Sequence, residues 1–210
     1  THPVRIERPQ NEDQVVALVN AAVSDGFRIR AVGSGHSFTG IAATNEVLVT
    51  LEEIADVRDI DVATGHVRVG AGIRLRDLNP HLEAKGLAMP NLGDIDYQSV
   101  AGAIATSTHG TGLAFHTIAD AVVGLRMVTG NGTVISCDRT TDPDLLHVSR
   151  VGLGALGIVT EVTLACVPAF NLHAIEEVLP VEEVVDSFDE WAENTDHTEF
   201  FWMPHTCLLY

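Results

Sequence analysis

Basic side chains are scarce in this sequence. Its 210 residues contain 12 Lys and Arg against 29 Asp and Glu, which gives a formal net charge of −17. Because a surface with this field repels phosphates, we expect no nucleic-acid partner. An anionic ligand can still bind where backbone N–H groups are aimed at it locally.

Cysteine is nearly absent as well. The three thiols, Cys137, Cys166 and Cys207, are odd in number and show no Cys-x-x-Cys spacing. This pattern argues against a disulfide scaffold and against a structural zinc site, and it fits a reducing compartment. We therefore expect a chain that holds no metal.

Long apolar runs are missing too. No stretch reaches the length of a membrane span, and residues 1–9 lack the apolar core of a secretory signal. We expect a cytoplasmic protein without an integral membrane segment, while loose attachment to a respiratory partner at a membrane stays open. The first residue is not Met, so we also expect the chain to begin inside a longer one.

The remaining composition, 46% apolar and 20% charged residues, is that of a globular protein. Residue periodicity and helix-end signals predict helices at 11–26, 75–85, 142–150 and 181–193. The predicted strands lie at 28–32, 47–51, 57–62, 66–69, 122–128, 133–137, 157–167, 172–178 and 198–203. Asn11 is the expected cap of the first helix, and the Gly130-Asn131-Gly132 segment indicates a hairpin.

One glycine pair comes directly after a predicted strand, in the segment Val32-Gly33-Ser34-Gly35-His36-Ser37. Two glycines one residue apart let the backbone turn sharply and aim consecutive N–H groups at one point, which suits a pyrophosphate. The alternative is a tight turn between strands. An imidazole held in such a loop could act as an acid, as a ligand, or as a nucleophile that bonds a cofactor.

A second segment, Ser99 to Gly112, consists mainly of small residues and hydroxyls. A flat group could lie against such a backbone, and the hydroxyls of Ser99, Thr106, Ser107 and Thr108 could donate to it. The alternative is a small-residue helix that packs closely on a sheet.

The segment Gly152 to Gly157 matches the G-x-G-x-x-G dinucleotide pattern letter for letter. Its glycines follow a predicted helix and precede a β-branched strand, whereas the fingerprint requires a strand and then a helix. We therefore reject an NAD site here. We expect either a loop that borders a ligand or a loop that only leads into the following strand. Serine-hydrolase and P-loop motifs are also absent from the sequence.

Five ordered blocks resemble one known family, at residues 30–38, 91–95, 99–102, 108–112 and 154–160. They are similar to the FAD-binding domain of the vanillyl-alcohol oxidase / p-cresol methylhydroxylase (PCMH) superfamily, in its sugar-1,4-lactone oxidase and alditol oxidase branch. The resemblance covers roughly residues 4–168. Residues 198–205 resemble the start of that branch's substrate domain.

The resemblance implies an α+β fold in which a PCMH-type FAD-binding domain spans 1–168. This domain has a small mixed α/β subdomain and a larger subdomain rich in antiparallel strands. Residues 169–210 would begin an α+β substrate (cap) domain that is cut off or incompletely observed, a boundary that Pro168 also marks.

The same resemblance assigns cofactor residues. His36 matches the histidine that bonds the flavin covalently, and the N–H groups of the loop would hold the pyrophosphate. Ile158 would meet the adenine through its backbone. The implied cofactor-binding residues are Ala31, Val32, Gly33, Ser34, Gly35, His36, Ser37, Gly93, Asp94, Ser99, Gly102, Thr106, Ser107, Thr108, His109 and Ile158.

Gly93 matches a position beside the flavin where a small residue admits dioxygen. The next residue is often Ser in the family, and here it is Asp94, whose charge would oppose a reduced, anionic flavin.

The implied reaction is hydride transfer from a carbinol of a sugar lactone or polyol to FAD, with dioxygen or another acceptor reoxidising the flavin. The catalytic groups are expected beyond Tyr210. Three alternatives stay open: a non-catalytic FAD-binding fragment, a dehydrogenase that uses a cytochrome or quinone, and the NADPH-dependent cell-wall precursor reductase branch, against which the Gly-His-Ser block argues.

Overall fold

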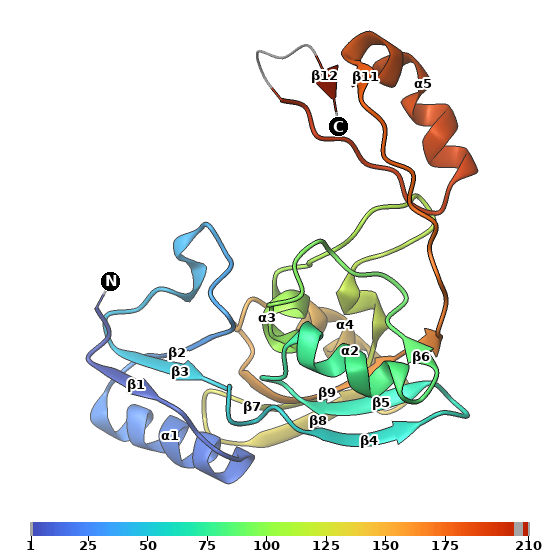
Figure 1. Ribbon diagram of the computed structural model, residues 1–210. Helices are drawn as coiled ribbons and strands as arrows, with labels where there is room; N and C mark the ends of the chain where they lie inside the picture. Colours follow the sequence, from blue (N-terminus) through green and yellow to red (C-terminus); the bar gives the residue numbers. More distant parts are fainter. Residues whose placement is uncertain (1, 204–207, 210) are drawn as a thin grey trace.

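The computed structural model describes residues 2–203 together with 208 and 209. Its N-terminal part is a parallel sheet of three strands in the order β1-β3-β2, formed by β1 (Arg5–Glu7), β2 (Ile29–Val32) and β3 (Val47–Thr50). Helix α1 (Glu12–Asp25) connects the first two strands (Figure 1). Strand β1 was not predicted, and it pairs with β3, more than 40 residues away.

Helix α1 forms where its end signals predict. The Asn11 side chain accepts a hydrogen bond from the Gln14 N–H at 3.0 Å, and Gly26 ends the helix at φ +73°. Val15 and Val19 face the core and are fully buried. The 3.6-residue spacing of these apolar side chains therefore fixes which side of the helix packs inward.

The larger part is an antiparallel sheet in the order β4-β5-β9-β7-β8. Its strands are β4 (Val57–Asp61), β5 (His66–Gly70), β7 (Val122–Val128), β8 (Val134–Asp138) and β9 (Ile158–Ala165). Burial alternates along the whole of β9, as expected for a strand with one face toward the core. The predicted hairpin joins β7 to β8, and Gly132 adopts φ +78° in its turn.

Three helices lie on one side of this sheet: α2 (Leu75–Glu83), α3 (Val100–Ala105) and α4 (Pro143–Arg150) (Figure 1). The shorter elements are β6 (Leu87–Ala88), β10 (Val167–Pro168) and the 3₁₀ turns at Gly40–Ala42 and Ile118–Ala121. One continuous apolar core extends from α1 through both sheets to the helices. The predicted fold class, mixed α and β with an antiparallel sheet, is confirmed.

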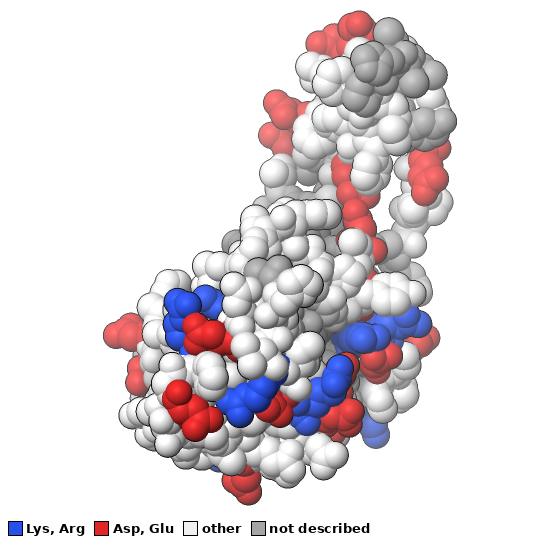
Figure 2. Space-filling model, turned by 90° about the vertical axis from the view of Figure 1, so that its left-hand side faces the viewer, with Lys and Arg blue, Asp and Glu red and all other residues white. Residues whose placement is uncertain are grey.

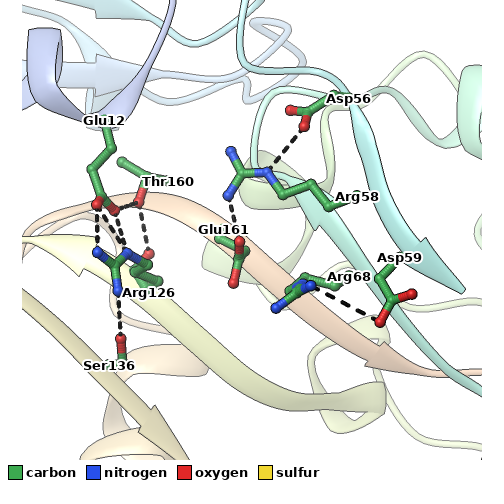
Figure 3. Close-up of polar contacts among 9 residues, drawn as sticks. All are labelled: Glu12, Asp56, Arg58, Asp59, Arg68, Arg126, Ser136, Thr160 and Glu161. Carbon is green, nitrogen blue, oxygen red and sulfur yellow. Dashed lines mark hydrogen bonds and ion pairs between the residues drawn. The ribbon is translucent and has the colours of Figure 1, made fainter. Parts of the chain in front are cut away.

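A polar network joins α1 to the large sheet (Figure 3). Arg126 on β7 donates to the Glu12 carboxylate from Nε at 2.8 and 2.9 Å. Thr160 on β9, which is fully buried, donates to the same carboxylate at 2.7 Å. Burial raises the pKa of Glu12, but the hydrogen bonds from Arg126 and Thr160 outweigh it and hold this pKa below its ordinary value.

We call residues 2–168 the body and residues 169–203 the arm. The arm rises away from the body (Figure 1) and contains β11 (Leu179–Pro180) and α5 (Val181–Asn194). Strand β12 (Leu208–Leu209) pairs with β11. Residues 204 and 205 of the stretch that resembles a substrate domain, and Cys207, lie outside the described residues.

Two strands predicted in the arm are wrong. Residues 172–178 have no regular secondary structure, and in 198–203 only an isolated bridge forms at Trp202. Both stretches have the apolar composition of strands. A strand also needs a neighbouring strand to pair with, and in the described part of the arm only Leu179–Pro180 has one.

The arm contacts the body at the loop that carries Thr111 and Phe115. The His197 ring stacks on Phe115 with centroids 4.7 Å apart, and its Nδ1 lies 3.0 Å from the Thr111 carbonyl oxygen. Gly112 adopts φ +100°, and a Cβ there would lie 2.2 Å from the Asp196 carbonyl oxygen. This contact therefore depends on a glycine.

Candidate functional site

The body contains a cavity of about 570 Å³ between the small sheet and the helical side of the large one. Its wall gathers three segments that lie far apart in the sequence: 30–37 after β2, 98–106 around α3, and 149–159 between α4 and β9. Each of the three segments singled out in the sequence therefore contributes to one cavity. A cavity of this volume is in the range that holds a cofactor-sized molecule.

The loop after β2 is held against α3 by very small residues. A Cβ on Gly33 would lie 2.6 Å from Ser99 Oγ and 3.1 Å from Gly102 Cα. Ser34 Oγ accepts a hydrogen bond from the Ser99 N–H at 3.0 Å, and Gly35 adopts φ +77°. Glycine is required here because the two backbones approach too closely for a side chain.

Helix α3 begins directly beside this loop. The Ser99 side chain accepts from the Gly102 N–H at 3.3 Å and caps the helix, and the Thr106 hydroxyl donates to the Gly102 carbonyl at 3.0 Å. These hydroxyls are thus engaged with the helix backbone. They fix the short helix in place beside the loop.

The third wall is the loop between α4 and β9. Leu153 and Gly154 adopt φ +51° and +73° there, and a Cβ on Gly157 would lie 2.5 Å from the Val128 carbonyl oxygen. The glycines follow a helix and precede a strand. The order of elements on which the NAD reading was rejected is therefore confirmed.

The structure brings most of the predicted residues together. Those that line the cavity are Ala31, Val32, Gly33, Ser34, Gly35, His36, Ser37, Ser99, Gly102, Thr106 and Ile158. His36 is exposed, so its ring is accessible to a group in the cavity.

Five predicted residues do not line this cavity: Gly93, Asp94, Ser107, Thr108 and His109. Gly93 lies against the 108–109 backbone, because a Cβ on it would be 3.0 Å from the His109 carbonyl oxygen. Thr108 Oγ1 accepts from Gln98 Nε2 at 3.1 Å. Asp94 is exposed. Of these five residues, Gly93, Thr108 and His109 thus lie together outside the wall of the cavity.

The wall residues that sequence reasoning missed include Arg30, the Ala71-Gly72 pair, Arg74 and Ser149. The signal that could have found Gly72 is a second Gly-x-Gly, Gly70-Ala71-Gly72, directly after the predicted strand 66–69. The structure gives its reason, since a Cβ on Gly72 would lie 1.7 Å from the Leu51 carbonyl oxygen. Arg30 opens the 30–38 block but was not assigned a role, and Ser149 lies in no motif. Their place follows only from how the sheets and helices pack.

Ser149 is informative about the ligand. It is 6% exposed, and its Oγ has no hydrogen-bond partner among the described residues. A buried hydroxyl without a partner is costly and rare. Together with the glycine-lined wall, this orphaned hydroxyl fits a cavity that takes a polar cofactor such as FAD.

Comparisons with protein families agree with the geometry. The family described as FAD binding domain matches residues 3–138, and the family described as D-arabinono-1,4-lactone oxidase matches residues 162–208. The first match covers most of the body. The second begins in β9 and covers the arm.

Curated relatives match along nearly the whole chain. An L-gulono-1,4-lactone dehydrogenase of Mycobacterium tuberculosis is 41% identical over 97% of this chain and 47% of its own length. An L-gulonolactone oxidase of Bos taurus is 34% identical over 95% and 45%. A D-arabinono-1,4-lactone oxidase of Eremothecium gossypii is 35% identical over 97% and 39%. The chain thus spans less than half the length of these relatives.

Solved structures show the same fold. A histidine mutant of cholesterol oxidase from Brevibacterium sterolicum has a TM-score of 0.72 at 22% identity, over 79% of this chain and 34% of that one. The 6-hydroxy-D-nicotine oxidase of Arthrobacter nicotinovorans has a TM-score of 0.72 at 25% identity, over 80% and 37%. The resemblance noted in the sequence is confirmed, and the chain belongs to the FAD-binding domain family.

Proposed function

We propose that this chain is the FAD-binding part of an oxidoreductase that oxidises a carbinol of a sugar 1,4-lactone or a polyol. The observation that carries the proposal is the single cavity that gathers residues 30–37, 98–106 and 149–159. The names of the three relatives support the substrate class.

Each wall segment has a role in this proposal. The N–H groups of Gly33 to Ser37 bind the diphosphate, because a loop with Gly35 in the left-handed region can aim several of them at one anion. The close packing of Gly33 on Gly102 keeps that loop beside α3. Ile158 also lines the cavity, and its backbone is the proposed contact of the adenine.

His36 is the proposed site of covalent attachment to the flavin. Its support is position: it follows Gly35 directly, lines the cavity and is exposed toward solvent rather than packed in the core. Acid-denatured full-length protein run on a gel should carry flavin fluorescence with the polypeptide. His36→Ala should release the flavin, and fluorescence that still travels with this variant would contradict the assignment.

Bound FAD supplies the two-electron acceptor for a hydride that leaves the carbinol carbon, while the hydroxyl proton passes to a base. We propose that this base belongs to a part of the whole protein outside these 210 residues. The body's part is to bind and orient the cofactor. A panel of sugar 1,4-lactones and polyols, mixed anaerobically with the full-length protein, should bleach the flavin's visible absorbance.

If no lactone or polyol bleaches a protein that holds flavin, the proposed activity is wrong and a non-catalytic FAD-binding role replaces it.

The proposal has two forms, an oxidase and a dehydrogenase, which differ in the electron acceptor. One relative is named a dehydrogenase and two are named oxidases, so the relatives support either dioxygen or another acceptor. Gly93 as an oxygen gate favours the oxidase, although it also has a packing role against His109. Rapid mixing of reduced full-length protein with dioxygen should reoxidise it quickly. Reoxidation no faster than that of free reduced flavin would favour a cytochrome or quinone acceptor.

We propose further that 1–168 is the FAD-binding PCMH-type domain and that 169–210 begins the substrate domain, in keeping with the two family matches. The proposed compartment is the cytoplasm. Within residues 2–203 and 208–209, no helix combines the length and apolarity that crossing a membrane requires.

A further inference from the structure

The arginines of this chain are unevenly engaged. Eleven of the 12 basic residues are Arg, and nine of these have a partner among the described residues. Seven form ion pairs, namely Arg5, Arg8, Arg28, Arg58, Arg68, Arg126 and Arg150. Arg139 donates to the Asp120 carbonyl oxygen, and the Arg76 guanidinium lies 4.4 Å above the centre of the Tyr97 ring.

The side chains of Arg30 and Arg74 have no partner within the described part of the chain, and both line the cavity. In a chain with 29 carboxylates, an arginine is expected to form an ion pair with one of them, as seven of the other arginines do. Two unpaired cations at the same cavity therefore indicate a site for an anion.

The two arginines come from segments that lie far apart in the sequence. Arg30 lies on β2, opposite Leu48 in the small sheet. Arg74 lies between β5 and α2 and forms a backbone bridge to Ser99, so it stands next to the start of α3. Its carbonyl oxygen accepts hydrogen bonds from the Asp77 and Leu78 N–H groups in the first turn of α2. Its side chain does not cap that helix.

One carboxylate, that of Glu52, also lines the cavity. It is already paired with Arg8, and it accepts from the Thr50 hydroxyl at 3.3 Å. Glu52 therefore does not neutralise Arg30 or Arg74. The arginines among the lining residues thus outnumber the carboxylates, whereas the chain as a whole is strongly negative and would repel an anionic ligand.

We propose that Arg30 and Arg74, which both line the cavity, bind the diphosphate of FAD and supply most of the electrostatic affinity for it. The inference rests on the proposed FAD function and adds two side chains to the backbone groups of the Gly33–Ser37 loop. Guanidinium groups suit this task because they present several fixed donors to phosphate oxygens.

The test uses the full-length protein carrying His36→Ala, which keeps FAD binding reversible. Calorimetric titration with FAD at low and at moderate salt gives the dissociation constant and its salt dependence. Arg30→Ala and Arg74→Ala should each weaken FAD binding on the order of tenfold and reduce the salt dependence. Arg30→Lys and Arg74→Lys, which keep the charge, should lose less.

The matched control is Arg68→Ala, which removes an exposed arginine of β5 that pairs with Asp59 at 3.9 Å away from the cavity. It should bind FAD like its parent. Because Arg30 and Arg74 have no partner in the described protein, their alanine variants should also melt like the parent when no flavin is present.

Four outcomes overturn the inference. Affinity within twofold of the control, unchanged salt dependence, or a lower melting temperature without flavin would each show that these arginines do not act as diphosphate ligands. FAD uptake by the His36→Ala parent would leave the proposed function standing in all three cases. A parent that takes up no FAD at all would overturn the proposed function and this inference together.

Discussion

The body and the arm differ in their content of glycine and of basic residues. All 18 glycines and all 12 basic residues lie in 1–168, whereas 169–210 contains ten acidic residues and no glycine, lysine or arginine. Figure 2 shows the same contrast on one face, with acidic but no basic side chains on the arm. Glycines and basic side chains therefore belong to the body alone, and the close approach of the arm at Asp196 is to a glycine of the body, Gly112.

Packing follows the same division. The body has one continuous core, while Val184 is the only apolar residue that is buried in the described arm. Ile175 is 76% exposed and Trp202 is 61% exposed. Within the arm, the Phe188 and Phe200 rings meet edge to face with centroids 5.3 Å apart. The contrast indicates that the body stabilises itself and the cavity, and that the arm adds little to either.

The largest expected effect is on a glycine of the body. Gly72→Ala should lower the free energy of unfolding by about 3 kcal/mol, because its Cβ would overlap the Leu51 carbonyl in the cavity wall. Chemical denaturation measures the loss. Gly130→Ala is the matched control, since a Cβ there meets no atom within 4 Å. Equal stability of the two variants would contradict the close approach at Gly72.

A smaller effect is expected at the network of Figure 3. Glu12→Gln should cost about 1 kcal/mol, because it removes the charge that Arg126 and Thr160 stabilise. The folded pKa of Glu12 lies below its unfolded value, so its contribution is complete above the unfolded pKa and is lost as pH falls through the folded one.

Denaturation curves of the parent and of Glu12→Gln should therefore converge toward acid pH. Asp59→Asn, which alters an exposed pair with Arg68 at 3.9 Å, should lose less at neutral pH. A constant difference between the parent and Glu12→Gln at every pH would contradict the ionic role of Glu12.

The contact between body and arm should matter only to the arm. His197→Ala removes the stacking on Phe115 and the bond to the Thr111 carbonyl, so protease cleavage within the arm should become faster while the body's melting temperature stays nearly constant. His173→Ala, an exposed residue of the arm, is the control. A body that melts earlier in His197→Ala would contradict the division into two regions.

The smallest expected effect on the body is that of losing the arm. A chain that ends after residue 171 keeps β10 and its pairing with β6, so its melting temperature should change by only a few degrees. It should also bind less of a hydrophobic dye, because the exposed apolar side chains of the arm are gone. Loss of the cooperative transition would show that the body depends on the arm.

Sequence patterns predicted the elements whose signals are local. Helix α1 carries its own cap at Asn11 and its own end at Gly26, and the β7–β8 hairpin carries its own turn. Strand β1 was missed because three residues are too few to show the alternation of apolar and polar side chains that marks a strand. Its partner, β3, is also distant in the sequence. The arm strands failed for the opposite reason: their apolar pattern is present, but a partner strand is not among the described residues.

The residues of the candidate site also divide into those with a local sequence signal and those without one. The residues of the loop after β2 were predicted because Gly-Ser-Gly-His is a motif in one stretch, and the structure places that loop in the cavity wall. Arg30, Arg74 and Ser149 lie far apart in the sequence and reach the same cavity wall only after folding. Gly93 matches a family motif and Asp94 departs from it, and neither residue lines the cavity.

The central claim, that the cavity holds FAD, has one direct measurement. The full-length protein is purified and dialysed, its visible spectrum is recorded, and flavin is quantified per chain. We expect a yellow protein with about one FAD per chain, or one that acquires it when FAD is added. A colourless protein that melts cooperatively and takes up no FAD on reconstitution would contradict the account.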